Sequence, residues 1–155
     1  MKEPEKFTIQ PGIGVSPILF GMSPEDVANL FDAPPKHSRI THTKERQDAW
    51  VLNGKFLFVV YGEENNGVVE VTLSPEHHAW INDTKILGTG TSVNPIKYLK
   101  WLDNEPLEGL GVLVFSKIDI STSGFHDNDK SQESLTAGVR GRFSSILHRL
   151  SPYKA

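Results

Sequence analysis

Cysteine is absent from this chain of 155 residues, which excludes disulfide bonds, thiolate metal sites and cysteine nucleophiles. A positive net charge is absent as well. The formal value is -3, so the chain lacks the global basic surface typical of nucleic-acid-binding domains. No apolar run approaches the roughly 20 residues of a membrane-spanning helix, and residues 1–6 lead into no apolar stretch of signal-peptide length. We therefore expect a soluble, cytoplasmic protein whose partners are neither nucleic acid nor membrane.

The overall composition is that of an ordinary globular protein, with 37% hydrophobic and 23% charged residues. A chain of this length fits one domain spanning residues 1–155. The strongest local signal lies at residues 12–35, where a short apolar strand and a glycine turn precede a helix that a double proline ends. Ser23 occupies the N-cap position, Pro24 the first helical position, and Asp26 lies three residues after the cap. The apolar stripe of this helix would consist of Val27, Leu30 and Phe31.

A three-stranded β-meander is predicted over residues 50–73. Residues 50–52, 55–61 and 68–73 are rich in β-branched and aromatic side chains, and Asn53-Gly54 is typical of a type I′ hairpin turn. The preceding stretch, residues 36–48, is polar and includes His37, Arg39 and Arg46. This local basic patch favours a solvated loop, with a phosphate-binding site as the alternative.

The second part of the chain follows a similar order of elements. Asn94-Pro95 predicts the start of a second helix, and apolar stretches at residues 112–115 and 118–122 predict further strands. A short strand at residues 137–141 and an amphipathic helix at residues 143–150 complete the prediction. We expect an α+β fold, an antiparallel sheet with short helices packed on one face. An internal quasi-repeat with halves at residues 12–75 and 85–143 is one interpretation of this order.

No stretch of the sequence carries a complete catalytic or cofactor-binding motif. His77-His78 is a weak metal signal, because adjacent side chains point in different directions and rarely ligate one ion. A hydrolase is one alternative interpretation, since His126-Asp127 lies near several serines of the same polar segment. The sequence otherwise predicts no catalytic residue, no metal and no cofactor.

Aromatic and acidic side chains are the candidates for contact with a partner. Most of the large aromatic residues are expected in the core, and Trp80, in a connecting segment, is the best candidate for an exposed anchor. The acidic candidates lie at predicted turns and helix ends, where charge complementarity with a basic partner would favour association. They are Glu63, Glu64, Asp103, Glu105 and Glu108.

Residues 20–34 resemble the start of BamE/SmpA-like modules. The matching positions are Gly21-Met22-Ser23, Glu25, Val27, Leu30 and Pro34, which follow the family's order of Gly-Met-Ser/Thr, Glu-Val and Leu-Gly-x-Pro. Asp32-Ala33 replaces the usual glycine. The resemblance implies a helical segment before an antiparallel sheet, and an assembly or ligand-binding module as a further alternative function. The family's role as an outer-membrane lipoprotein does not carry over, because the chain has no cysteine to bear a lipid.

Over residues 12–143 the chain is similar to small bacterial cytoplasmic proteins, some of which are immunity partners of polymorphic or contact-dependent growth inhibition toxins. This resemblance rests on packing and turn residues, so no functional residue transfers from it. It implies a non-catalytic protein-binding protein that neutralises a cognate toxin domain by covering its active site. On this hypothesis the acidic side chains would face a basic, nuclease-like surface.

Overall fold

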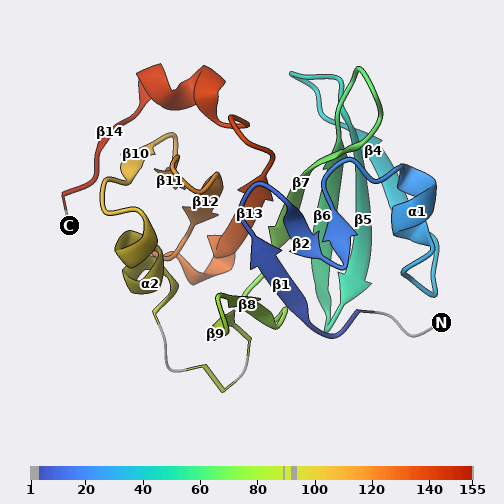
Figure 1. Cartoon of the computed structure of the whole chain (residues 1–155), viewed down its shortest axis with the longest axis horizontal. Coiled ribbons are helices and arrows are strands. Elements are labelled where there is room, and N and C mark those ends of the chain that lie inside the picture. The colour runs from blue at the N-terminus through green and yellow to red at the C-terminus, as the bar shows by residue number, and fades with distance from the viewer. Residues whose placement is uncertain (1–3, 89, 92–93, 155) are drawn as a thin grey trace.

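The computed structural model describes residues 4–88, 90–91 and 94–154, which form two β-sheets with short helices (Figure 1). The smaller sheet consists of β1 (Phe7–Gln10), β2 (Gly14–Ser16), β3 (Ile18–Leu19), β8 (Ala79–Ile81) and β9 (Thr84–Leu87). The larger sheet consists of β4 (Lys36–Arg39), β5 (Arg46–Leu52), β6 (Lys55–Tyr61), β7 (Val68–Leu73), β10 (Leu107–Gly109), β11 (Val112–Phe115), β12 (Ile120–Ser123), β13 (Ser134–Gly138) and β14 (Ser151–Pro152). The helices are α1 (Pro24–Ala28), α2 (Pro95–Leu102) and the 3₁₀ helices η1 (Lys130–Gln132) and η2 (Ser144–Arg149).

Antiparallel pairing dominates both sheets, which confirms the predicted α+β class. The exception is β1, which pairs parallel with β8. The larger sheet has the order β14-β10-β11-β12-β13-β7-β6-β5-β4, so two runs of strands, β4–β7 and β10–β13, meet where β7 pairs with β13. The internal quasi-repeat of residues 12–75 and 85–143 stays a prediction.

The helix α1 begins as its sequence predicts. Ser23 is the N-cap, its Oγ accepts a hydrogen bond from the Asp26 backbone N–H at 3.1 Å, and Pro24 is the first helical residue. The helix is shorter than its apolar stripe suggests, because it ends at Ala28 and continues only as tight turns through Phe31. Asn94 caps α2 in the same way, through a 2.9 Å bond from the Ile96 backbone N–H.

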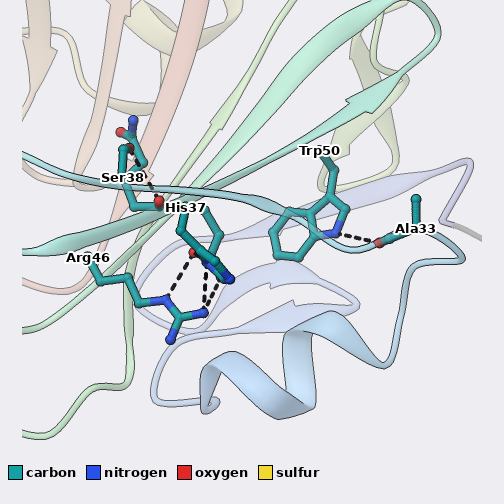
Figure 2. A network of polar contacts seen from close by, with 7 residues as sticks. Ala33, His37, Ser38, Arg46 and Trp50 are labelled. Carbon is teal, nitrogen blue, oxygen red and sulfur yellow. Dashed lines mark hydrogen bonds and ion pairs between the residues drawn. The ribbon is translucent and has the colours of Figure 1, made fainter.

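The predicted meander is confirmed as β5, β6 and β7. Asn53 and Gly54 have φ values of 52° and 76°, and the type I′ turn between β5 and β6 needs positive φ at both positions. Behind α1, Phe31 stacks on Trp50 of β5 with 4.3 Å between ring centroids, and the Trp50 indole N–H donates to the Ala33 carbonyl at 3.2 Å (Figure 2). These contacts direct the chain after α1 onto the edge of the larger sheet, where it becomes β4.

One contiguous apolar core joins the two sheets and both α-helices. Its fully buried members include Phe7, Val27, Leu57, Leu99 and Phe115, which come from β1, α1, β6, α2 and β11. Among the described residues, no helix is long and apolar enough to cross a membrane.

Three local predictions are wrong. Residues 36–39 form a strand instead of a solvated loop. Most large aromatic residues are expected in the core, but Trp101 is 77% exposed on α2. The C-terminal segment forms the 3₁₀ helix η2 with no buried residue, instead of an amphipathic α-helix. Residues 139–150 connect β13 to β14, which pairs with β10, and a short 3₁₀ helix fits within that connection.

Candidate functional site

The strand β4 lies at the outer edge of the larger sheet and is the most accessible strand of the hairpin it forms with β5. All four of its residues are exposed. Within the described part of the chain, β4 is hydrogen-bonded to β5 alone, so one side of its backbone is unpaired. The sequence does not predict this strand, because Lys36-His37-Ser38-Arg39 has no apolar residue to give an alternating pattern.

The register of the hairpin identifies which backbone groups face outward. Just beyond β4, the Ile40 backbone N–H donates to the Glu45 carbonyl at 2.9 Å, so these two residues form a hydrogen-bonded pair. Hydrogen-bonded and non-hydrogen-bonded pairs alternate along an antiparallel ladder. Ser38 opposite Gln47 is therefore also hydrogen-bonded, whereas His37 and Arg39 direct their backbone N–H and C=O groups toward the open edge.

The same register separates the side chains onto two faces. His37 lies opposite Asp48 and Arg39 opposite Arg46, so these four side chains share one face of the hairpin. Figure 2 shows His37 and Arg46 on the side of α1, with Ser38 on the other side of the strand. Three basic side chains and one carboxylate thus meet on the face toward α1.

Asp48 is the centre of this cluster and is completely buried. Its Oδ1 lies 2.6 Å from His37 Nδ1 and 3.0 Å from Arg46 Nε, while its Oδ2 accepts from Arg46 Nη2 at 3.0 Å. The short contact with a carboxylate places the proton of His37 on Nδ1, so the 3.0 Å approach of Arg46 Nη2 to that nitrogen is not a hydrogen bond. His37 Nε2 is left for contact with a ligand, on a side chain that is 60% exposed.

Two groups beside Asp48, the Arg46 guanidinium and the Tyr61 hydroxyl, have a raised pKa. The hydrogen bonds with Asp48 raise the pKa of the Arg46 guanidinium, so Arg46 stays charged. Burial, with the Asp48 charge as a further cause, raises the pKa of the Tyr61 hydroxyl, which has no hydrogen-bond partner among the described residues. The Arg46 guanidinium also lies 5.6 Å from the Tyr61 ring centroid, a cation–π contact that helps to fix its position.

A second ion cluster ties the hairpin to the C-terminal part of the chain. Arg142, after β13, donates two hydrogen bonds to the Glu45 carboxylate at 2.7 and 2.8 Å and one to the Glu70 carboxylate at 2.8 Å. Glu45 is buried and directly precedes β5. The hydrogen bonds from Arg142 lower the pKa of the Glu45 carboxyl, so Glu45 is ionised at neutral pH and the ion pair is intact.

Two concavities adjoin the basic face of the hairpin. One has a volume of about 400 Å³ and is lined by His37, Ser38, Arg39 and Arg46. The other, of about 490 Å³, lies between His37, Arg46 and the start of α1, where Glu25 contributes a carboxylate. The residues that line the first include three basic ones and no acidic one, which suits a ligand that carries negative charge.

The acidic candidates do not form one surface. Glu63 and Glu64 are exposed in the turn after β6, whereas Glu105 and Glu108 lie before and within β10. Five strand-to-strand steps separate β6 from β10 in the sheet, about 24 Å at the usual spacing. Glu105 is also paired with Lys117 at 2.8 Å.

Asp103, the remaining acidic candidate, has a structural role. Its side chain is buried, and its two carboxylate oxygens accept hydrogen bonds from the Glu105 and Lys117 backbone N–H groups at 3.0 and 3.1 Å. The carboxylate therefore fixes the chain after α2, and contact of Asp103 with a partner stays a prediction.

Trp80 is also less available than expected. It lies in strand β8 rather than in a connector, it is only partly exposed, and the Lys6 and Lys85 ammonium groups lie 4.7 and 5.3 Å from its ring centroid. Trp101 is the more exposed tryptophan, and its ring lies 6.0 Å from that of Tyr98.

The histidine candidates take structural positions. His77 is buried, its Nδ1 accepts from the Ser74 backbone N–H at 3.0 Å, and its Nε2 donates to the Leu52 carbonyl at 3.0 Å. Burial lowers the pKa of His77, which keeps the ring neutral. No group of three or more potential metal ligands occurs among the residues that the structure describes.

The hydrolase interpretation finds no nucleophile–base pair at residues 126–127. His126 Nδ1 is buried without a hydrogen-bond partner in the described ranges, and Asp127 is exposed. The hydroxyl of Ser123 donates to the Gln132 carbonyl at 2.6 Å, and that of Ser131 donates to Asp129 at 2.7 Å.

The comparisons with known proteins give no match: no family model, no curated protein and no solved structure is significantly similar to this chain.

Proposed function

We propose that this chain is a non-catalytic protein-binding protein whose partner adds a strand to the open edge of β4. The observation that carries the proposal is the unpaired side of β4, where His37 and Arg39 direct two backbone N–H groups and two carbonyls away from the sheet. Strand addition to such an edge is a recurring mode of peptide recognition, in which the main-chain hydrogen bonds supply affinity.

Side-chain contacts fix the position of the strands at this edge before a partner binds. Asp48 fixes His37 and Arg46, and the Arg142 tie holds Glu45 at the start of β5. A strand positioned in this way loses little conformational freedom when a partner pairs with it, which favours binding.

In its narrower form, the proposal is that the chain is a cytoplasmic immunity protein and that the partner is a cognate toxin domain whose active site it covers. The acidic surface first expected for this role is dispersed, so the contact is assigned to β4 and not to Glu63, Glu64, Glu105 and Glu108. A toxin with an exposed strand next to its active site would fit this mode of inhibition.

Charged residues on an edge strand also prevent unwanted pairing between copies of a protein. Lys36 and Arg39, together with the two prolines before β4, would serve that purpose without any partner. The two explanations differ in one measurable respect: only a strand-adding partner forms hydrogen bonds with the outward backbone groups.

The test uses the complex between this chain and the product of the neighbouring gene, with two substitutions at one position. Arg39→Pro removes the outward backbone N–H and keeps the inner ladder, because proline is tolerated where the N–H faces away from the sheet. Arg39→Ala removes the same side chain and keeps the N–H, so it is the matched control. Binding is measured by titration calorimetry.

We expect Arg39→Pro to bind about tenfold more weakly than Arg39→Ala, the loss expected for one net hydrogen bond at the upper end of its range. Hydrogen exchange of the His37 and Arg39 amides should slow in the complex. Equal affinities of the two variants, with unchanged exchange of these amides, would refute strand addition. Absence of a complex at micromolar concentration would refute the assignment of this partner.

A further inference from the structure

We infer that the strand added to β4 is acidic, with carboxylates at alternate positions that contact the basic face formed by His37, Arg39 and Arg46. This inference rests on the proposed function, because it names the chemistry of the partner at the same edge. Three features favour this ligand: the spacing of the basic groups, their free donors and the charge of the hairpin.

The spacing comes from the two residues of β4 that face outward. His37 and Arg39 are two residues apart, so their side chains lie on the same face about 7 Å from each other. A strand paired with β4 presents its own side chains on that face with the same period. Two partner residues separated by one position therefore lie beside His37 and Arg39 at once.

Free donors point to carboxylates as the matching groups. Arg46 uses Nε and Nη2 to bind Asp48, which leaves Nη1 without a partner in the described part of the chain. Arg39 uses Nη1 to bind the Lys44 carbonyl at 3.2 Å, and its other guanidinium nitrogens remain for a ligand. Both arginines line the 400 Å³ concavity at the edge, and an arginine fork matches the geometry of a carboxylate.

The charge of the hairpin favours the same ligand. Lys36, Arg39, Lys44 and Arg46 carry four positive charges. Glu45 and Asp48 carry two negative charges, which Arg142 and Arg46 bind. Glu25 adds a carboxylate in the neighbouring concavity, which the start of α1 also lines. The strand edge therefore attracts an acidic strand and repels a second copy of itself.

A single-stranded nucleic acid is the other ligand with regular negative charge. It has no backbone N–H and C=O groups to pair with the edge of a sheet, so its binding would use the side chains alone. The net charge of -3 of the whole chain also disfavours a polyanion that extends beyond the hairpin. The observations thus favour the acidic peptide, and the nucleic acid becomes an outcome of the test.

The test uses the full chain and three labelled peptides of about ten residues with a strand-forming Thr/Val framework. The alternate positions carry Glu in the first peptide, Gln in the second and Lys in the third. Fluorescence anisotropy at low ionic strength gives the affinities, and an oligothymidylate of similar length is the fourth probe.

We expect the Glu peptide to bind about tenfold more tightly than the Gln peptide, and the Lys peptide and the oligothymidylate to bind more weakly than both. Arg39→Gln should reduce the Glu-to-Gln preference to about twofold and leave the Gln peptide nearly unaffected. Arg46→Gln should have the same effect, and circular dichroism checks that it folds. Lys130→Gln, which removes an exposed positive charge from η1, is the matched control and should leave the preference unchanged.

The results separate the acidic character of the ligand from the addition of a strand. Equal binding of the Glu and Gln peptides would overturn the inference and leave strand addition standing. A preference for Glu combined with equal affinities of Arg39→Pro and Arg39→Ala would support the acidic ligand and refute strand addition. Tighter binding of the oligothymidylate than of the Glu peptide would overturn the acidic peptide in favour of nucleic acid. No binding of any peptide at about 1 mM would overturn the inference.

Discussion

Replacing Arg142 with methionine should destabilise the fold strongly, because it leaves two carboxylates without their shared cation. Arg142 donates three charge-assisted hydrogen bonds, two to Glu45 and one to Glu70. Removing one partner of a buried ion pair costs about 3–5 kcal/mol. The Arg142 and Glu70 side chains are about a fifth exposed, so water reduces this cost. We expect a loss near 3 kcal/mol in the free energy of unfolding at pH 7.

Urea unfolding monitored by circular dichroism measures this loss, and its pH dependence tests the cause. In the folded chain Arg142 holds the pKa of the Glu45 carboxyl below its ordinary value of 4.5. The unfolded chain therefore binds the proton more readily, so the stabilisation is present above pH 4.5 and decreases as the pH falls through the folded-state pKa. The difference between wild type and Arg142→Met should narrow in the same range.

The control for this prediction is Lys117→Met. It breaks an ion pair with Glu105 of the same 2.8 Å length, in which both side chains are more than half exposed. We expect no measurable change, because water screens exposed pairs. A loss below about 1 kcal/mol for Arg142→Met, or an equal loss at pH 7 and at about pH 3.5, would refute the reasoning. Glu45→Gln and Glu70→Gln together should restore much of the stability in the Arg142→Met background.

Three further substitutions test individual side chains. His77 has a lowered pKa because it is buried, so the unfolded chain binds its proton more readily; the melting temperature should fall as the pH drops below about 6.5, and the fall should be smaller in His77→Gln. Asp103→Asn should cost about 1–2 kcal/mol in urea unfolding, because the amide can accept only one of the two backbone hydrogen bonds. Trp101→Ser should change the unfolding free energy by less than about 0.5 kcal/mol, because the ring is 77% exposed; a larger loss would mean that the ring packs on α2.

Sequence patterns that act over a few residues predict the local structure correctly. Ser23, Asn94 and Asn53-Gly54 act within a few residues of themselves, and each forms the cap or turn that its sequence predicts. The sequence also predicts the meander at β5–β7, because these strands are rich in β-branched and aromatic residues and Asn53-Gly54 marks the turn between β5 and β6. The strand β4 was missed, because both of its faces are exposed and its residues carry no period of burial.

The candidate site was only partly visible in the sequence. The sequence indicates a basic patch within residues 36–48, but the role of its side chains depends on the hairpin register that brings His37 opposite Asp48. The acidic candidates share their charge but lie far apart, because β6 and β10 lie on different sides of the β7–β13 junction. Composition and local spacing contain no information about that separation.

The helix caps, the tight turn and the strands of the meander follow from short stretches of the sequence, because caps and turns satisfy backbone groups a few residues away. Long-range packing leaves β4 at the edge of the sheet and buries Asp48 between His37 and Arg46. It also pairs Arg142 with a glutamate 97 positions earlier in the chain. The burial of a charge and the exposure of a sheet edge depend on which distant segments pack together, and the order of residues along the chain does not reveal that.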